Sequence, residues 1–459
     1  MAEAAEKLEI HDEDGVLTSN FVAAVEDAVE ADDAGRLKLL TEGLHEADFA
    51  DLMELMRADD REQFIKLLDR DINYAALTEL DEKILDEVLD VLPPDTVAEA
   101  VTELESDDAV YLLEGLEPEE QAEVLAKVSI TDRLAVERSL EFPEDSAGRL
   151  MQIELVAVPP FWTVGQTIDY MRTTDDLPNS FVEVFVVDPS FRLVGTIQVS
   201  RILRTPRDAK VTDIMSAEQT IFHVDDEEED VAYKFEQYNL VSAAVVDASE
   251  RLVGVITIDD IVDVIQEGVE EDIHRLGGVG DEEITDTVWT TTRSRFAWLL
   301  INLGTAVLAS WVISLFDATI EQMVALAVLM PIVASMGGNA GTQTMTVAVR
   351  AIATRDLGSL NALRVIGRET TVGLLNGIVF ALIIGLVATA WFGSTELGMV
   401  IGAAMIVNMI VAALSGILIP LTLDRLDIDP AIASTVFVTT VTDVVGFFAF
   451  LGMAAAWLL

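Results

Sequence analysis

The sequence predicts a multidomain protein: an α-helical superhelical domain, a tandem pair of α/β units, an acidic connecting helix, and an all-α membrane domain of five transmembrane helices. Three observations lead to this prediction. The charge changes abruptly near residue 290, five long uncharged or nearly uncharged segments follow that point, and an internal repeat precedes it. At roughly 150 residues per domain, the length suits about three domains.

The acidic residues are concentrated in the first part of the chain. Residues 1–289 hold 72 Asp and Glu against 21 Lys and Arg, whereas residues 290–459 hold 9 against 7. Such a charge argues against a nucleic-acid partner, and the absence of Cys argues against a disulfide scaffold. The 7 Lys against 21 Arg, beside so many acids, favour a high-salt cytoplasm such as that of a halophilic archaeon. The alternative is an acidic domain that handles cations, and both can hold.

The first region is predicted to be helical. Residues 1–17 are expected to form a disordered acidic tail, and residues 18–142 a superhelix of short amphipathic helices. Proline followed by acidic residues recurs where helices should begin, as at Pro94 and Pro118, and this combination suits a first helical turn. Asp107 and Asp108 could complete cation sites against the next domain, although each taken singly is better explained as a solvated surface charge.

Residues 143–262 contain an internal repeat with an offset of 59 residues. The run from Phe185 to Ile197 aligns with the run from Ala244 to Ile256, and each unit predicts a strand, a turn, a strand and a helix. A second, shorter similarity relates residues 148–151 to residues 213–215. The pattern is similar to a tandem pair of CBS domains, modules that usually bind a regulatory ligand between them.

The second repeat unit carries a candidate nucleotide site. Thr257 and Asp260 resemble the ribose-contacting pattern of nucleotide-binding CBS units, whereas the first unit has Gln198 and Arg201 at those positions. The resemblance therefore implies a single site, with ATP as the candidate regulator. The alternative for Asp260 is a charge at a helix N-terminus, stabilised by the helix dipole.

An acidic connecting helix and linker are predicted over residues 263–292, with a glycine-containing link from Gly277 to Thr292. Acidic side chains recur on one side of this helix, at three- and four-residue steps: Asp260, Asp263, Glu267, Glu270 and Glu271. Like charges at this spacing repel one another, and a divalent cation would relieve that repulsion. The alternative is a solvated face adapted to high salt.

Five segments of the domain at residues 293–459 are predicted to cross the membrane, at about 297–316, 322–349, 370–395, 397–423 and 430–459. None is shorter than the ~20 residues that cross ~30 Å of hydrocarbon as a helix. The polar, acidic N-terminus does not have the pattern of a cleavable signal peptide.

The basic residues predict the orientation. Seven Arg flank the spans on one side of the membrane, at positions 293, 295, 350, 355, 364, 368 and 425, and the connections on the other side have no Lys or Arg. Because basic residues favour the cytoplasmic side, the large N-terminal part is predicted to be cytoplasmic and the C-terminus extracellular.

Asp443 is the one charge inside the predicted spans, near the middle of the last one. An unpaired carboxylate at that depth costs roughly 2.5–3.5 kcal/mol and usually faces a water-filled path or a partner. The spans contain no Lys or Arg to pair with it, so a cation is the expected partner. Thr435 and Thr439 share its helix face. The alternative is a neutral Asp443 that packs helices through hydrogen bonds.

The second span contains Pro331 and then three glycines within five residues. We expect an unwound backbone that lines a cavity, with Asn339 and Gln343 offering oxygen ligands or hydrogen bonds to a hydrated ion. The alternative is close helix packing through small residues. Asn408 and Ser415 in the fourth span are better suited to hydrogen bonds between helices than to ion binding.

These motifs resemble those of the MgtE family of magnesium channels or transporters. The resemblance rests on residues 331–343, 429–431 and 440–446, continues upstream in residues 271–277, and extends to the helical N-terminal domain. It implies a homodimer whose second and fifth spans line a central Mg²⁺ path. The implied metal ligands are Asp443 in the pore and Asp429, Asp260, Asp263, Glu271 and Asp272. The implied pore-lining residues are Gly337, Gly338, Asn339, Gly341, Gln343, Thr435 and Thr439.

The sequence thus predicts a channel or transporter in the cell membrane that admits Mg²⁺ and is closed by cytosolic Mg²⁺ at acidic domain interfaces. The alternative is a divalent cation transporter regulated mainly by an adenine nucleotide at the CBS pair. An intramembrane enzyme is not expected, because the four His lie outside the spans and Asp443 has no second acid for a catalytic pair. A membrane sensor without flux is disfavoured by Asp443 and by the glycines of the second span.

Overall fold

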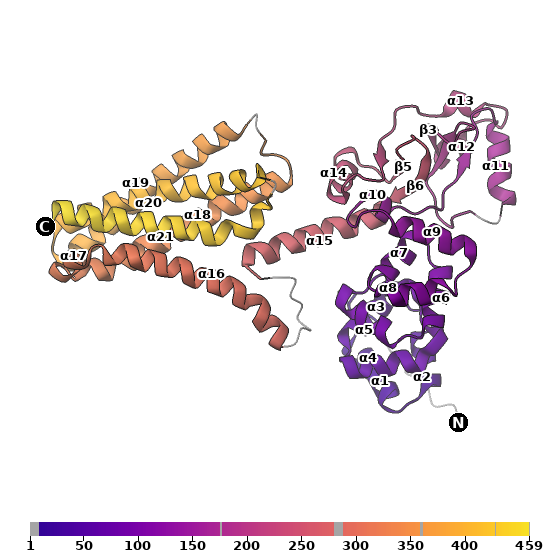
Figure 1. Ribbon diagram of the computed structural model, residues 1–459, viewed down its shortest axis with the longest axis horizontal. Helices are drawn as coiled ribbons and strands as arrows, with labels where there is room; N and C mark the ends of the chain where they lie inside the picture. The colour runs from indigo at the N-terminus through magenta and orange to yellow at the C-terminus, as the bar shows by residue number, and fades with distance from the viewer. Residues whose placement is uncertain (1–8, 175–176, 280–287, 359–360, 427, 459) are drawn as a thin grey trace. The chain divides into compact units, whose positions relative to one another are not determined.

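The computed structural model describes residues 9–174, 177–279, 288–358, 361–426 and 428–458 (Figure 1). The chain divides into two compact units, Met1–Ile265 and Gln266–Leu459. Their boundary falls inside one continuous helix, α15 (Ile258–Gly277). Gly268 lies in α15 just beyond this boundary, and no neighbouring atom of the described part of the chain lies within 4 Å of the position that a Cβ would take there.

The first unit begins with short helices, as the sequence predicts. Caps explain where several of them start: the side chains of Thr18, Asp33 and Ser129 accept hydrogen bonds from backbone N–H groups of the first turn. Phe21, Phe49 and Phe64 are among the side chains that fill the common core. The helices are α1 (Ser19–Glu30), α2 (Ala34–Thr41), α3 (Glu46–Leu55), α4 (Ala58–Leu68), η1 (Asp69–Asp71), η2 (Tyr74–Leu77), α5 (Glu82–Val91), α6 (Pro94–Glu103), α7 (Ser106–Glu114), α8 (Pro118–Leu125) and α9 (Ile130–Leu140).

Residues 9–17 form a turn, where the sequence predicts part of a disordered tail. His11 and Leu17 pair across this turn, and the Asp12 carboxylate accepts hydrogen bonds from the backbone N–H groups of Asp14 and Val16. The Leu17 side chain is buried in the helical core. An Asp that closes its own turn and one apolar anchor explain the difference. Residues 1–8 lie outside the described residues.

The internal repeat is confirmed as two α/β units. Each has a three-stranded sheet, in the order β1-β2-β3 or β4-β5-β6, with the first pair parallel and the second antiparallel. Val186 pairs with Gly195 and Val245 pairs with Gly254, so the register also repeats at an offset of 59. The elements are α10 (Ala147–Leu150), β1 (Ala157–Val158), α11 (Val164–Thr173), β2 (Glu183–Val187), β3 (Leu193–Gln198), α12 (Val199–Arg204), α13 (Val211–Ile214), β4 (Ile221–His223), α14 (Glu228–Tyr238), β5 (Ser242–Val246) and β6 (Leu252–Thr257), followed by α15.

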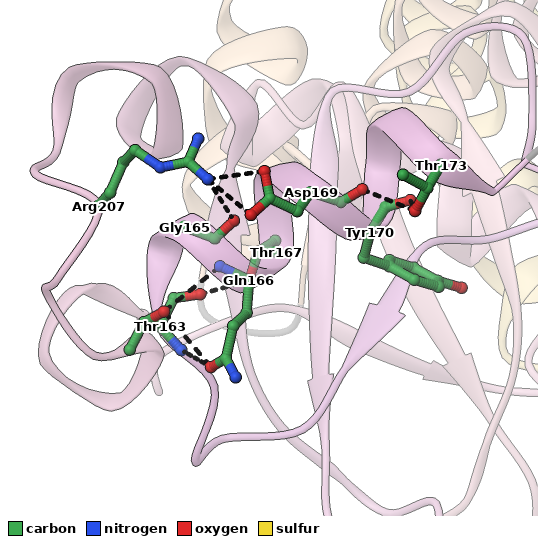
Figure 2. Close-up of polar contacts among 8 residues, drawn as sticks. All are labelled: Thr163, Gly165, Gln166, Thr167, Asp169, Tyr170, Thr173 and Arg207. Atoms are coloured by element: carbon green, nitrogen blue, oxygen red, sulfur yellow. Dashed lines mark hydrogen bonds and ion pairs between the residues drawn. The ribbon is translucent and has the colours of Figure 1, made fainter.

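Helix α11 shows how the first repeat unit is held together (Figure 2). Thr163 and Gln166 form a capping box, in which each side chain hydrogen-bonds to the backbone of the other residue. Arg207, from the segment after α12, pairs with Asp169 of α11 and donates to the carbonyl of Gly165 at 3.2 Å. These contacts tie α11 to a segment about forty residues further along the chain.

Among its described residues, the second unit contains five helices that are long and apolar enough to cross a membrane. Helix α20 is the most buried of them and packs against α18, α19 and α21; in Figure 1 the long orange and yellow helices lie side by side. Apolar side chains of α16 and α19, such as Trp311 and Leu386, are exposed on the outside, as lipid-facing residues would be. The helices are α16 (Val288–Ser314), α17 (Asp317–Gln322), α18 (Ala325–Ala353), α19 (Ala362–Phe392), α20 (Thr395–Asp424) and α21 (Pro430–Trp457).

The second long helix is not unwound at its glycines, so that prediction was wrong. Helix α18 runs without interruption through Gly337, Gly338 and Gly341. A Cβ on Gly341 would overlap the Val438 side chain of α21, and one on Gly337 would overlap the Asn408 side chain of α20. The glycines therefore permit close helix packing, which was the alternative explanation. Of the predicted link, residues 280–287 lie outside the described residues, and residues 288–292 already belong to α16.

Candidate ion path and regulatory carboxylates

Helix α21 carries the candidate ion ligands of the membrane unit. Its first turn is fixed by Asp429, whose side chain accepts a 2.7 Å hydrogen bond from the backbone N–H of Ala431, and by Pro430 at the first helical position. Thr435, Thr439 and Asp443 then follow at four-residue steps, and the side chains of Thr439 and Asp443 are partly exposed. The predicted polar face of this helix is therefore present.

Asp443 has no hydrogen-bond donor or oppositely charged side chain on its carboxylate among the residues that the structure describes. The hydroxyl of Thr439 donates to the backbone carbonyl of Thr435 at 2.8 Å, so its oxygen lone pairs remain on the polar face. A carboxylate beside such oxygens is suited to attract a cation, directly or through the waters that the ion carries.

Helix α18 contributes a second polar face. The side chains of Asn339 and Gln343 are at least partly exposed, and a Cβ on Gly338 would lie 3.6 Å from the methyl group of Thr439, which brings α18 and α21 together at this level. Gly337 and Gly341, by contrast, are buried against α20 and α21. In the single chain, these two predicted pore-lining glycines therefore face the helix packing.

The end of α15 lies against the start of α21. Arg275 forms ion pairs with Glu271 on its own helix and with Asp429. The hydroxyl of Thr435 donates to the Leu276 carbonyl at 3.0 Å. The Leu276 side chain packs against a small apolar cluster from α18 and α21: Met345, Val349, Ala431 and Val438. Two predicted metal ligands, Glu271 and Asp429, thus share one guanidinium group.

Sequence reasoning missed Arg275, although it lies in a motif singled out there. Its position four residues after Glu271 is the spacing of an ion pair on one helix face. Its partner Asp429 is 154 residues further along the chain, and no local pattern could have revealed that contact. Asp272 follows Glu271 on the same helix.

A second group of carboxylates lies in the first unit, where the N-terminal end of α7 meets the start of α15. Burial, together with the neighbouring Asp260 and Asp108, raises the pKa of Asp107 well above its usual range. Burial and the charges of Glu105 and Asp259 raise the pKa of Asp108 to about 6. Each carboxyl is therefore harder to ionise, because it is buried and because its neighbours are also acidic.

The start of α15 shows the same effect. Burial and the adjacent Asp259 raise the pKa of Asp260 to about 7, and the same two causes raise the pKa of Asp263. Asp263 in turn raises the pKa of Glu79, whose own burial is the larger cause. The predicted ligands Asp260 and Asp263 are thus brought together with Asp107 and Asp108. We call these four residues the acidic cluster.

Hydrogen bonds between distant segments hold the acidic cluster in place. The Ser106 hydroxyl at the start of α7 donates to Glu154 at 2.7 Å and accepts from the backbone N–H of Ile153 at 2.8 Å. The amide of Gln152 donates to Glu105 at 3.0 Å. Glu105 and Glu154 were not singled out from the sequence, since contacts across 47 and 48 residues leave no local pattern.

The two candidate nucleotide residues bind each other. The Thr257 hydroxyl donates to Asp260 at 3.0 Å and also contacts Asp259. The backbone N–H of Thr257 lies 3.4 Å from the same Asp260 oxygen. This arrangement places Asp260 over the first turn of α15, as expected for a charge at a helix N-terminus.

Within the described ranges, no three His, Asp or Glu side chains converge closely enough to enclose a metal ion as they are placed. Crowded carboxylates without a counter-ion repel one another, and a divalent cation that drew them together would offset that repulsion. Mg²⁺ suits such a site because it keeps several waters and needs only one or two direct carboxylates.

Family profiles match three parts of the chain. A family profile described as "Divalent cation transporter" (MgtE) matches residues 330–453, the MgtE intracellular N domain matches residues 44–145, and the CBS domain matches residues 211–267. The soluble part is also similar to a crystal structure of the cytosolic domain of the Mg²⁺ channel MgtE in complex with ATP, with 27% identity and a TM-score of 0.49 over 53% of this chain and 99% of that one.

Two curated relatives cover most of the chain. The magnesium transporter MgtE of Bacillus subtilis is 30% identical over 71% of this chain and 72% of its own length. That of Thermus thermophilus is 33% identical over 70% of this chain and 72% of its own length. The chain, a multi-pass membrane protein with an intracellular N-terminal domain, therefore belongs to the MgtE family of magnesium transporters and not to an enzyme family.

Proposed function

We propose that the protein is a Mg²⁺ channel of the cell membrane, which admits Mg²⁺ down its electrochemical gradient and closes when cytosolic Mg²⁺ rises. The pore forms in a homodimer, between the polar faces of α18 and α21 of the two subunits. The C-terminus lies outside the cell, because all basic residues near the membrane helices flank the opposite side.

One observation carries the permeation part of this proposal. Asp443 lies within a 28-residue apolar helix, and no described residue neutralises it. Keeping an unpaired carboxylate at this depth costs roughly 2.5–3.5 kcal/mol, so a functional partner is expected. A dimer with its axis between the polar faces would bring two such carboxylates to one path. There they would attract a divalent cation that still carries part of its water shell.

The acidic cluster supports the regulatory part. Its carboxyls lie close together, and burial together with their mutual repulsion raises the pKa values of Asp107, Asp108 and Asp260. A Mg²⁺ ion bound there would relieve the repulsion and draw α7 and α15 together. Glu271 and Asp272 would add ligands further along α15. For this binding to close the pore, the closed state must bind the regulatory ions more tightly than the open state.

Arg275 supports a route from these sites to the pore helices. It joins α15 to the first turn of α21 through Asp429, and Leu276 packs against both α18 and α21. A change in the tilt or position of α15 would therefore act directly on the two helices that line the proposed path.

The test is Mg²⁺ flux into liposomes that contain the purified protein, with the Mg²⁺ concentration on the cytosolic side varied. We expect wild-type flux to fall as cytosolic Mg²⁺ rises. Flux of a variant with Asp260→Asn, Asp263→Asn, Glu271→Gln and Asp272→Asn should persist at all these concentrations. A matched control removes four exposed acids of α8 and its flanks: Glu117, Glu119, Glu120 and Glu123. Inhibition of the first variant at wild-type concentrations would refute the gating role.

An adenine nucleotide at Thr257 and Asp260 is the second candidate regulator. Because these two side chains hydrogen-bond to each other, a ribose would have to compete with the existing contact. Calorimetric titration of the full-length protein with ATP, with and without Mg²⁺, separates the two candidates. Heat of binding that disappears in Thr257→Val, together with flux that follows ATP more closely than Mg²⁺, would favour the nucleotide.

A further inference from the structure

Asn408 places a polar amide at the point where three membrane helices meet. It lies near the middle of α20, and its side chain is fully buried. Its Nδ2 donates a 2.8 Å hydrogen bond to the backbone carbonyl of Val333 in α18. Its Oδ1 is buried and has no hydrogen-bond partner among the described residues.

Two glycines on different helices make room for this amide. A Cβ on Gly337 of α18 would overlap the amide, and a Cβ on Gly446 of α21 would lie 2.8 Å from Nδ2. Asn408 thus occupies the space that side chains at both positions would fill. In effect, the amide of α20 is a spacer between α18 and α21.

The chemistry of the spacer is not explained by packing alone. A buried acceptor without a partner costs free energy, and an apolar side chain of similar size would avoid that cost. Ser415, the other polar residue buried in α20, forms its hydrogen bond within α20, to the carbonyl of Ala412 at 3.2 Å. Of these two buried side chains, Asn408 alone forms a described hydrogen bond to another helix.

We infer that Asn408 is a positioning residue that sets the separation of α18 and α21 and, through it, the discrimination among divalent cations. Gly446 follows Asp443 by three residues, and Gly337 precedes Asn339 by two, so the spacer acts within a turn of the candidate ligands. This inference rests on the proposed function, since it requires that α18 and α21 line the ion path.

Discrimination between Mg²⁺ and Ca²⁺ should depend on the separation of α18 and α21. Mg²⁺ holds its waters tightly in a nearly ideal octahedron, whereas Ca²⁺ accepts longer and more variable coordination. A path that is spaced for one hydrated ion therefore loses discrimination when its walls move. Removing the spacer should change the ratio of Mg²⁺ to Ca²⁺ flux, and not only the total flux.

The first measurement is this ratio, taken in liposomes with each ion supplied alone at equal concentration. For Asn408→Ala we expect the ratio to change by about fivefold, whereas Ser415→Ala, which removes a buried hydroxyl of the same helix, should keep the wild-type ratio. A folded, conducting Asn408→Ala protein with the wild-type ratio would overturn the inference.

The second measurement is a rescue. Gly337→Ala alone should lower Mg²⁺ flux by about tenfold, because its methyl group overlaps the amide. Combining it with Asn408→Ala should restore the flux to that of Asn408→Ala alone. Gly373→Ala is the control: its Cβ would meet Ala413 and the Met409 carbonyl, not Asn408. Asn408→Ala should therefore not rescue it. Failure of the Gly337 rescue would also overturn the inference.

Size-exclusion profiles of every variant separate misfolding from altered flux. If Asn408→Ala does not fold, the flux ratio and the rescue are measured with Asn408→Ser instead. The serine hydroxyl is too short to reach the carbonyl of Val333. The proposed function and this inference fail in different ways. Wild-type Mg²⁺ flux in Asp443→Ala refutes the first, whereas wild-type ratios in the Asn408 variants refute only the second.

Discussion

In the first unit, acidic side chains at the start of α7 and the start of α15 are buried close to one another, and burial together with their neighbours' charges raises their pKa values. In the second unit, helix α21 presents its one carboxylate, Asp443, on a face of hydroxyl groups. In the proposed function both arrangements attract cations, but the source of the attraction differs. The acidic cluster would attract a cation because several carboxylates repel one another there. Asp443 would attract one because no other described group pairs with its carboxylate.

This difference explains how one protein could retain an ion at one site and let the same ion pass at another. A cluster that is strained without metal gains free energy when an ion binds and stays, which suits a sensor. A single carboxylate that meets an ion still in its water shell binds it weakly enough to let it pass, as conduction requires. The predictions below would break or sharpen this comparison.

Asp443→Ala should have the largest effect. Without the carboxylate, no negative charge of α21 offsets the loss of water from the ion, and we expect Mg²⁺ flux to fall by about 100-fold or more. Flux into liposomes at low cytosolic Mg²⁺ measures this. Glu396→Gln, at an exposed acid in the first turn of α20, is the control for a lost charge and should keep wild-type flux.

Asp108→Asn should stabilise the first unit in the absence of metal. The raised pKa means that the folded state binds a proton more tightly than the unfolded state, so stability is greatest at acid pH and is lost as pH rises from about 4 through about 6. At pH 7.5 a neutral amide should raise the free energy of unfolding by roughly 1–3 kcal/mol. The change should appear in the first thermal transition of the full-length protein in chelator.

Asp247→Asn is the opposite control for this measurement. Backbone N–H groups of Arg251 and Ser249 donate to the Asp247 carboxylate and lower its pKa. Its charge therefore stabilises the fold, and its loss should lower the same transition temperature. A destabilised Asp108→Asn would contradict the idea that the acidic cluster stores repulsion.

Inhibition by cytosolic Mg²⁺ should weaken as pH falls. Asp260, with a pKa of about 7, is mostly protonated at pH 6 and mostly ionised at pH 8. Because Mg²⁺ must displace that proton, we expect the concentration for half inhibition to be about tenfold higher at pH 6 than at pH 8. Flux titrations at the two pH values measure this, and Asp260→Asn should reduce the difference. An inhibition constant independent of pH would contradict the pKa shift.

Arg275→Gln should have the smallest effect, on the transmission from α15 to the pore helices. Loss of the ion pair with Asp429 removes one contact between α15 and α21, while the packing of Leu276 remains. We expect inhibition to require about threefold more Mg²⁺, with flux at low Mg²⁺ retained. Asp429→Arg combined with Arg275→Asp should restore part of the loss. An unaltered inhibition curve would assign the transmission to Leu276 packing alone.

Much of the fold followed from local patterns. The repeat was predictable because the same alternation of apolar residues recurs 59 residues later, and the observed register repeats with it. The five long helices were predictable from uncharged length. The first and third of them begin before the predicted limits, at Val288 and Ala362, because polar residues continue a helix past the hydrocarbon without changing its backbone.

The rest depended on contacts between distant segments. The glycines of α18 favour unwinding when propensity alone is considered, but packing against Asn408 and Val438 keeps the helix intact. The pairing of Arg275 with Asp429, and of Ser106 with Glu154, joins residues 154 and 48 positions apart. Neither has a signal in a single sequence, and both determine where the candidate ligands lie.

One glycine of α15, Gly268, affects how easily this helix bends. Among the described residues, none has a side chain within 4 Å of the position that a Cβ would take at Gly268, so alanine would fit there, yet the helix has the residue that bends most readily. A rod of twenty residues is about 30 Å long, and ten degrees of flexure at one end displaces the other by about 5 Å. The stiffness of α15 at this position would therefore govern how much of a movement at one end of the helix reaches the other end. The single methyl group that Gly268→Ala adds would be enough to change that stiffness.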